Sequence, residues 1–593
     1  MRGLVSPLSG VRPYTRSVVI DAIDTLLRPG NAARLKPVER AILRNYLDKF
    51  SAPEPGLNWS GGSYRAETTV GKNEMPLNFN FNLGMDAEFA AGFVPVFGET
   101  NIGGELWVQV DFSGDIGRNV SYGFYNEGGL IRQPRRLLGQ YNTYYDGFEV
   151  TGPYINENGP QEYVNQVIDV YGEPLTHFPF TYRQRWEGSI FNLGSLTDYK
   201  HWPENLSGGY SMNAELTTAF LGNRLVLRLG RLRREWGSMP LGTSLMFNNA
   251  ARPFLAAEFE FRPISWFGIS SLTGILDYAN TEGIKTSSMT NQNAFSITMF
   301  QFRISDYVSI DLMDAVVWPK RFELAYMAPI NLSFFSQNNI GDFDNMALAM
   351  NVRAQYPGVG NMWFSLFVDE MSLQNNMWNY DRTMIAYQAG INIPIPAMAF
   401  SSLRLSYTKI NPYTYTHNRN INPWYGDLLM ETGWTNNGVA LGHYLPPNSD
   451  EFLLRFTAMP AKGLSANLQY QMIRRGANFG SSAVDGSHLA SELDPERGPE
   501  NNITYRFFLR DGAYQWMHIA KVGADWKLPN LPVSLFGETG VIFSYFTNIG
   551  RAANNADLKP DETPGPSSFK RIDTPEYPMS TTFITRIGFR IFR

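Results

Sequence analysis

The sequence of 593 residues contains no cysteine, and charged residues make up only 18% of it. Without cysteine the chain cannot form a disulfide scaffold, a thiolate nucleophile, an iron–sulfur cluster or a zinc site with cysteine ligands. Soluble globular chains carry about 25% charged residues, so this chain is poor in charge. Its formal net charge is -5, with basic and acidic residues interspersed, and this pattern predicts no nucleic-acid partner.

Long hydrophobic runs are also missing. No stretch approaches 18 consecutive apolar residues, which excludes a helix that spans a membrane. The first residues, 1 to 7, lack the sustained apolar core of a signal peptide, so we expect the numbering to begin after processing.

The common motifs of soluble enzymes are absent. The sequence contains no P-loop, no His-Glu-x-x-His and no Gly-x-Ser-x-Gly. Its six histidines are far apart, and none lies at the spacing of a helical metal-binding pair. We therefore predict a protein that is not an enzyme and has no cofactor or metal site. An enzyme that combines an acid and a histidine on surface loops is the least favoured alternative.

Alternation of apolar and polar residues is the dominant pattern that is present. It is plainest at residues 77–83, and it recurs at 106–112, 403–408, 451–456 and 583–591. A period of two is typical of β-strands with one apolar and one polar face. The sequence therefore predicts an all-β protein for most of its length.

Two all-β architectures fit this alternation. In a soluble sandwich the apolar faces pack inward, whereas in a membrane barrel they meet lipid and the polar faces line a lumen. Strands of about 9–11 residues, long polar loops such as 481–502, and aromatic residues near strand ends favour the membrane. The aromatic residues in question are Trp363, Tyr545 and Phe546. We therefore predict a transmembrane antiparallel β-barrel.

The N-terminal region has a different period. Val19, Ile23 and Leu26 recur at helical spacing, and Pro37 opens a second run with Val38, Ile42 and Tyr46. The sequence predicts a short α-helical hairpin over residues 15–50. We expect residues 1–55 to form a periplasmic helical segment and residues 56–593 to form the barrel.

Two clusters of side chains suit a carbohydrate ligand. Arginine can hold carboxylates or sugar hydroxyls through two hydrogen bonds, and aromatic rings offer flat faces to sugars. Alternatively, the arginines form ion pairs inside the lumen, and the aromatic residues form an interfacial girdle. The candidate polysaccharide contacts are Arg231, Arg233, Trp236, Arg252, Tyr413, Tyr415, His417, Trp424, Trp434 and His443.

Several islands of sequence resemble the capsule-assembly (Wzi-type) outer-membrane family. They occur in consistent order at residues 9–16, 230–237, 248–254, 331–335, 341–345, 413–415, 441–443 and 450–451. The resemblance implies a monomeric barrel of about 18 strands (16–18) in the bacterial outer membrane, with a periplasmic helical bundle and a largely blocked lumen. It also implies a lectin-like role in attaching surface or capsular polysaccharide. Outer-membrane lipid and the polysaccharide export machinery are the other implied partners.

A channel is the main alternative function. An arginine-bearing lumen could pass anions or sugars across the outer membrane, as a porin does. The sequence does not decide between a polysaccharide-binding barrel and such a porin, because both need the same strand pattern.

Overall fold

The computed structural model describes most of the barrel and part of the long loops. The described residues are 4–5, 8–50, 55–58, 62–72, 74–94, 99–132, 188–192, 206–276, 293–319, 323–328, 330, 332–340, 344–370, 383–415, 420–422, 428–430, 433–436, 439–445, 447–476, 508–509, 513–529, 531–548, 570–572 and 579–592. Within these ranges no helix is long and apolar enough to cross a membrane.

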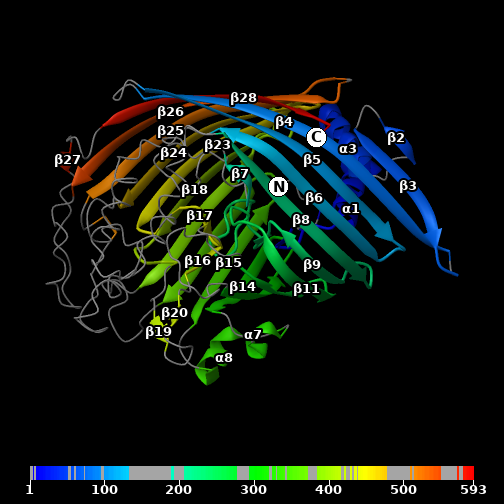
Figure 1. Ribbon diagram of the computed structural model, residues 1–593, viewed down its shortest axis with the longest axis horizontal. Helices are drawn as coiled ribbons and strands as arrows, with labels where there is room; N and C mark the ends of the chain where they lie inside the picture. The colour runs from blue at the N-terminus through cyan, green and yellow to red at the C-terminus, as the bar shows by residue number, and fades with distance from the viewer. Residues whose placement is uncertain are drawn as a thin grey trace.

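Eighteen strands of the described chain form a closed antiparallel ring (Figure 1). This confirms the predicted barrel and its strand number. In ring order the strands are β4 (Met75–Val94), β5 (Glu99–Ile116), β6 (Val120–Arg132), β8 (Leu206–Phe220), β9 (Leu225–Leu232), β11 (Phe254–Ile264), β12 (Phe267–Ile275), β13 (Asn293–Arg303), β14 (Val308–Pro319), β15 (Asn345–Tyr356), β16 (Gly360–Glu370), β17 (Met384–Pro394), β18 (Ser402–Ile410), β23 (Ser449–Ala461), β24 (Leu464–Gly476), β25 (Ala513–Lys527), β26 (Val533–Asn548) and β28 (Ser580–Ile591).

The ring closes where the last strand meets the first. β28 pairs with the second half of β4, from Met85 opposite Ile591 to Phe93 opposite Phe583. The first half of β4 pairs instead with β3 (Ser63–Val70). β4 is therefore long enough to close the barrel and to extend beyond it.

The remaining strands and helices lie at the rims, in the loops or inside the lumen. The strands are β1 (Val11–Arg12), β2 (Gly56–Asn58), β7 (Gly188–Asn192), β10 (Glu235–Trp236), β19 (Asn420–Asn422), β20 (Leu428–Met430), β21 (Thr435–Asn436), β22 (Val439–Ala440) and β27 (Lys570–Ile572). The helices are α1 (Arg16–Leu27), α2 (Pro29–Ala32), α3 (Pro37–Phe50), α7 (Leu324–Met327) and α8 (Ser333–Ile340).

The outer surface of the barrel is apolar. On β18, Leu405 is exposed on the outside, whereas its neighbours Arg404 and Ser406 line a cavity inside. β25 shows the same arrangement, because Val522 is exposed on the outside and Lys521 faces the cavity. Apolar side chains outside and polar ones inside are the arrangement that a membrane barrel requires.

The aromatic residues near the strand ends do not all face lipid. Trp363 and Phe546, two of the strand-end aromatic residues by which the sequence favoured a membrane barrel, are buried inside the barrel, and Trp363 donates its indole N–H to Gln388 at 2.8 Å. Alternate residues of a strand face opposite sides of the sheet, and both side chains fall on the lumenal side. The expectation that these two aromatic residues face the membrane interface is therefore wrong. Exposed aromatic residues do ring one end of the barrel, at Trp266, Tyr307, Tyr356 and Trp526.

The two ends of the barrel differ in the length of their connections. At one end the strands are joined by short turns, such as residues 117–119 and 462–463. At the other end the connections are long, such as 233–253 between β9 and β11 and 411–448 between β18 and β23. Outer-membrane barrels have short periplasmic turns and long extracellular loops, which assigns the short-turn end to the periplasm.

The predicted helical hairpin lies at the short-turn end. Lys36 donates to the carbonyl of Ala397 at 3.1 Å in the β17–β18 turn, and Asn223 in the β8–β9 turn donates to Ser17 at 3.0 Å. Ile23 of α1 packs with Leu43 of α3. On α3, which covers the second predicted run, Ile42 is buried, whereas Val38 and Tyr46 are more than a third exposed.

The chain ahead of the helices enters the lumen. β1 pairs with β10, with Val11 opposite Trp236 and Arg12 opposite Glu235. The backbone N–H of Gly237 also donates to the carbonyl of Gly10 at 2.9 Å. The N-terminal segment therefore begins with a lumenal strand rather than with the helices.

Candidate functional site

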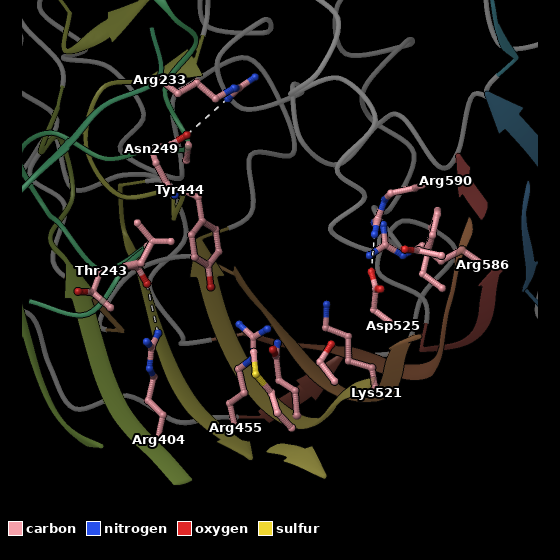
Figure 2. A pocket seen from close by; sticks show the side chains of 18 of the residues that line it. Arg233, Thr243, Asn249, Arg404, Tyr444, Arg455, Lys521, Asp525, Arg586 and Arg590 are labelled. Atoms are coloured by element: carbon pink, nitrogen blue, oxygen red, sulfur yellow. Dashed lines mark hydrogen bonds and ion pairs between the residues drawn. The ribbon is translucent and has the colours of Figure 1, made fainter. Parts of the chain in front are cut away.

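The lumen contains a cavity of about 1160 Å³ (Figure 2). It extends from Arg233 and Asn249, near the extracellular ends of the strands, to Lys462 in a periplasmic turn. Ile42 and Tyr46 of α3 line it at the periplasmic mouth. The cavity occupies one side of the lumen, along β4–β8 and β17–β28.

One wall of the cavity is acidic. Asp86 and Glu88 of β4, Glu105 of β5 and Glu127 of β6 all line it. Glu88 lies directly opposite Glu105 in the β4–β5 register, so the sheet itself brings these two carboxylates together.

The facing wall is basic. Arg404 of β18 is directly opposite Arg455 of β23. Gln469 of β24 is opposite both Arg455 and Lys521 of β25, so the four residues form one row across the strands. Lys521 is paired, because its ammonium lies 3.6 Å from the Glu538 carboxylate. The row therefore presents cations and an amide to the cavity at one height.

Neither arginine of this row has a carboxylate within 4 Å among the described residues, although Glu235 and Glu451 are near enough to attract Arg404. Arg404 donates to the carbonyl of Leu241 at 3.4 Å, and the buried Nε of Arg455 has no hydrogen-bond partner within the described chain. Like charges directly opposite one another on neighbouring strands repel. An anion that entered the cavity would relieve this repulsion and could accept hydrogen bonds from both guanidinium groups.

An aromatic ring projects into the cavity above the basic row. Figure 2 shows Tyr444 pointing from the loop side toward Arg455. Its hydroxyl accepts a hydrogen bond from the Gln471 amide at 2.7 Å, and its ring stacks on His443 with centroids 4.5 Å apart. Tyr444 therefore combines a partly exposed ring with nearby amides, which is the composition of a carbohydrate site.

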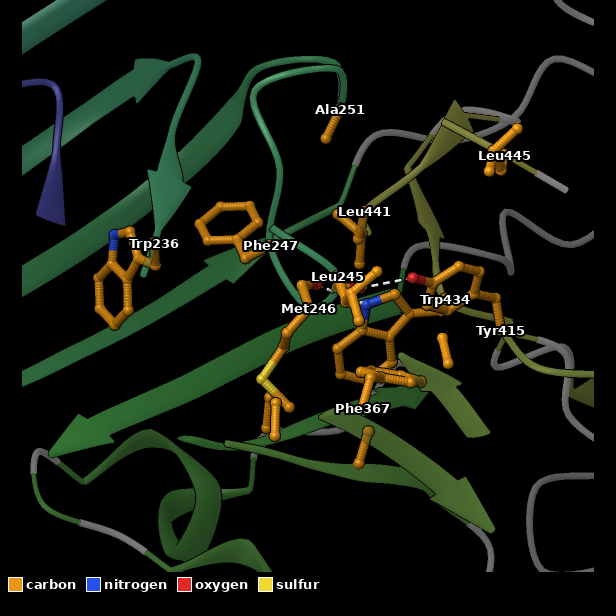
Figure 3. Close-up of a cluster of buried hydrophobic side chains, with 14 of the residues drawn as sticks. Trp236, Leu245, Met246, Phe247, Ala251, Phe367, Tyr415, Trp434, Leu441 and Leu445 are labelled. Atoms are coloured by element: carbon orange, nitrogen blue, oxygen red, sulfur yellow. Dashed lines mark hydrogen bonds between the residues drawn. The ribbon is translucent and has the colours of Figure 1, made fainter. Parts of the chain in front are cut away.

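The other side of the lumen is filled by an apolar plug (Figure 3). We define the plug as the described residues of the 233–253 and 411–448 connections. Trp434 packs against Phe295 and Phe367 of the barrel wall, with ring centroids 5.5 and 5.7 Å away, and donates its indole N–H to the carbonyl of Met246 at 2.8 Å. Tyr415 donates its hydroxyl to the carbonyl of Leu245 at 2.6 Å. These contacts join the two connections to each other and to the wall.

Buried carboxylates fix the plug in place. Asp311 of β14 accepts from the backbone N–H of Ser238 at 2.6 Å and from its hydroxyl at 2.8 Å. Glu235 accepts from the backbone N–H groups of Gly242 and Thr243 at 2.8 and 3.2 Å, and Arg12 lies 3.6 Å away. Burial nevertheless raises the pKa of Glu235, against the opposing effect of these donors. Such anchors favour a fixed plug over a movable one.

Part of the cationic stretch from residue 228 to 234 serves the barrel wall. Arg228 and Arg234 both bind the buried carboxylate of Glu258, the latter at 2.9 Å. Arg234 also donates to the carbonyl of Gly230 at 2.8 Å. These two arginines therefore fit the alternative in which ion pairs inside the lumen hold the barrel rigid.

The four predicted arginine and histidine contacts that are described lie in different places. Arg231 faces the outside of β9, opposite the exposed Leu255, so it cannot reach a lumenal ligand. Arg233 and His443 line the cavity. Arg252 is partly buried in the plug, where its carbonyl accepts from Asn436 at 2.9 Å.

Burial keeps His443 neutral. It is 2% exposed, and its Nδ1 accepts the backbone N–H of Leu445 at 3.3 Å. Removal from water lowers the pKa of His443 to about 3. His443 therefore supports Tyr444 as a neutral ring and offers no positive charge to a ligand at neutral pH.

The predicted aromatic contacts are mostly core residues. Trp236, Tyr413, Tyr415 and Trp434 are each at most 1% exposed, which leaves no ring face for a sugar. Their burial corrects our expectation for these four positions. His417 and Trp424 lie outside the described residues.

Sequence reasoning missed the residues that line the cavity most directly. Arg404, Arg455 and Lys521 lie on separate strands with ordinary alternation, and only the register places them in one row. Tyr444 is next to the predicted His443 and could have been chosen by its aromatic character alone.

Comparisons with known proteins agree with this fold. No protein-family model matches the chain, and no curated protein matches it in sequence. Its structure is similar to that of Wzi from Escherichia coli, an outer-membrane protein involved in group 1 capsule assembly and a carbohydrate-binding β-barrel. That match has a TM-score of 0.51 and 10% identity and covers 100% of this chain and 95% of Wzi.

Two Pseudomonas aeruginosa structures match less well. OccK3 (OpdO) gives a TM-score of 0.36 at 8% identity, with 86% of this chain and 95% of that chain covered. OccK9 (OpdG) gives 0.39 at 9% identity, with 86% and 98% covered. The resemblance that the sequence suggested is thus confirmed at the level of the fold: the chain is an 18-strand outer-membrane β-barrel similar to Wzi.

Proposed function

We propose that the protein is a non-enzymatic outer-membrane barrel that binds an acidic surface polysaccharide and attaches it to the cell. Many weak hydrogen bonds and ring contacts, repeated along a polymer, would replace tight binding of a single sugar by avidity. The role in attachment rests on the likeness of this fold to a carbohydrate-binding barrel.

The observation that carries the proposal is the arginine pair on β18 and β23. Arg404 and Arg455 face the cavity without a described carboxylate within 4 Å, and they lie beside Gln469 and the Tyr444 ring. A uronic acid residue would supply a carboxylate for the guanidinium groups, hydroxyls for the amide and an apolar ring face for the tyrosine. Arg233 and Arg252 would extend the contact toward the surface.

Retention of polysaccharide on cells tests the proposal. Cells that lack the gene should release polysaccharide into the medium while synthesis stays normal, and the wild-type gene should restore retention. An R404Q/R455Q double variant should restore it poorly, whereas an R303Q variant, altered at the periplasmic end of β13 and away from the cavity, should restore it fully. Unchanged retention in the deletion strain would contradict the proposed role.

The same cavity favours a channel as a second candidate function. It extends over much of the barrel height and has acidic and basic walls that face each other. Recordings from planar lipid bilayers distinguish the two functions, because an open pore gives a large steady conductance. Little conductance, together with binding of uronate oligosaccharides, would favour the polysaccharide-binding barrel; a large conductance without such binding would favour the channel.

We also propose that the barrel acts as a monomer and that α1–α3 form the surface nearest to the export machinery. The support is their position at the periplasmic mouth, where α3 lines the opening of the cavity. Cross-linking from single-cysteine variants of α3 in intact cells would test this contact, since the chain has no cysteine of its own.

A further inference from the structure

The outer face of β14 changes character along the strand. Asp311 and Met313 face the lumen, so the alternate residues Leu312, Asp314 and Val316 face outward. Leu312 is 43% exposed, as expected for a lipid-facing residue, but Asp314 is 4% and Val316 0% exposed. Some element must therefore cover the outside of the barrel wall toward the extracellular end of this strand.

That element is the pair of helices α7 and α8. They follow β14 in the chain and lie outside the ring, at the bottom of Figure 1. Tyr326 of α7 is fully buried, packs against Trp318 with ring centroids 5.2 Å apart, and donates its hydroxyl to Asp344 at 2.9 Å. Ile340 of α8 packs against the same buried cluster. We call α7 and α8, with the residues that join them, the elbow.

The elbow also covers a polar patch of the wall. Asp314 would be a costly carboxylate on a lipid-facing surface. Both carboxylate oxygens of Asp314 are buried and have no hydrogen-bond partner among the described residues, and the backbone N–H groups of Ser333 and Phe334, at the start of α8, lie near enough to stabilise its charge. The positive end of the α8 dipole favours a negative charge at this position. Thr298, opposite Asp314 on β13, is likewise buried at 2% exposure.

The outer surface of the elbow is strongly apolar. Leu324 is 65% exposed, Ile330 57% and Phe335 62%. The sequence from 324 to 341 contains no charged residue. An exposed apolar surface of this kind marks a contact with another molecule.

The surroundings of the elbow identify that contact. Leu312 on β14 and Leu348 on β15 are exposed on the same outer surface, in the apolar belt that meets the membrane. The exposed side chains of the elbow continue this belt outward. Between residues 324 and 341 the elbow offers no charged group with which a water-soluble partner could form an ion pair.

We propose that the elbow is inserted among the acyl chains of the outer leaflet, with its apolar side toward lipid and its inner side over the polar patch at Asp314. The barrel wall would then contact the membrane through this element instead of through the extracellular half of β14, whereas Leu312 faces lipid directly. The inference does not depend on the function proposed for the lumen.

Spin labels attached to single cysteines test the insertion, because the chain contains no other cysteine. The variant F335C is labelled and reconstituted in lipid bilayers, and the access of oxygen and of a water-soluble nickel chelate to the label is measured by power saturation. L348C provides the lipid-facing reference. D306C, in an exposed periplasmic turn, provides the aqueous reference.

We expect the label at 335 to resemble that at 348, with high access of oxygen and low access of nickel. A label at 335 that resembles the one at 306 would overturn the proposal. All three positions are exposed, so the substitutions should leave the fold intact. Adding D314A to F335C should increase access of nickel at 335, because the attraction between the carboxylate and the N-terminal end of α8 is lost; unchanged access would contradict the role given to Asp314.

Discussion

The lumen of this barrel is divided into two regions with opposite chemistry. Along β11–β16 the inner wall is mostly apolar and meets a plug whose aromatic rings are excluded from water. Along β18–β28 and β4–β8 the wall is charged and faces a cavity of about 1160 Å³. The same closed sheet thus serves as one half of a hydrophobic core and as one lining of a polar site. Stability should depend on the first region, and ligand binding on the second.

The largest expected effect is on stability, in the apolar region. Trp434→Ala should lower the free energy of unfolding by about 3–5 kcal/mol, because it leaves a cavity in the plug and removes the hydrogen bond to Met246. Urea unfolding of the refolded barrel in lipid vesicles measures this. Trp526→Ala, at an exposed position on the outer surface, is the matched control and should cost much less. Equal losses in both variants would mean that the plug is not a core.

The second effect is a pH dependence that originates at the border between the two regions. The pKa of His443 is lowered to about 3 in the folded protein, from 6.5 in the unfolded chain. Between these values the unfolded state binds more protons, so stability rises with pH across this window and is lost on acidification. From pH 6.5 to 4.5 the loss should be about 2 kcal/mol.

His443→Asn tests this assignment, because asparagine keeps an acceptor for the N–H of Leu445 but does not titrate. The variant should lose less stability than the wild type between pH 6.5 and 4.5 in the same unfolding experiment. Identical pH profiles for the two proteins would assign the acid sensitivity to other groups.

The third effect concerns binding, in the polar region. R404Q/R455Q should weaken binding of a uronate oligosaccharide by about 10- to 100-fold, since charge-assisted hydrogen bonds contribute about 1.5–3 kcal/mol. Stability should stay equal or rise slightly, because two like charges that face each other across strands are removed. Isothermal titration and urea unfolding give the two readings. If stability falls together with binding, these arginines contribute to the stability of the barrel, as expected of the apolar region.

The smallest effect should come from one hydrogen bond. Tyr444→Phe removes the hydroxyl that accepts from Gln471 and should cost about 1 kcal/mol or less in stability. Tyr444→Ala should in addition weaken binding of the oligosaccharide, because the ring face is lost. If both variants bind like the wild type, the ring is not part of the site.

The sequence was sufficient for the strands and for the location of the apolar surface. Residues 77–83 lie in β4 and residues 403–408 in β18, as their alternation predicted. Alternation is a local property of the sequence, so it can be recognised without knowledge of the fold. Parity within one strand would also have shown that Arg228 and Arg231 point to opposite faces, because they are three residues apart.

The contents of the lumen could not be predicted in the same way. Trp434 bonds to Met246, 188 positions away, and Tyr415 bonds to Leu245, 170 positions away. Aromatic residues in long loops suit a sugar site, a girdle or a core equally well, and only long-range packing decides among these. The basic row depends likewise on the register of strands that lie far apart in the chain.

The pairing of β28 with β4 has a consequence for assembly. β28 is synthesised after every other strand of the ring, and by then residues 8–15 have already been made. β1 pairs with β10 inside that ring, so residues 11–12 occupy a space whose boundary is completed by β28. Closing the seam around a pre-positioned segment would enclose it without threading. Pairing of β28 with β4 is then the folding step that encloses the N-terminal segment in the lumen.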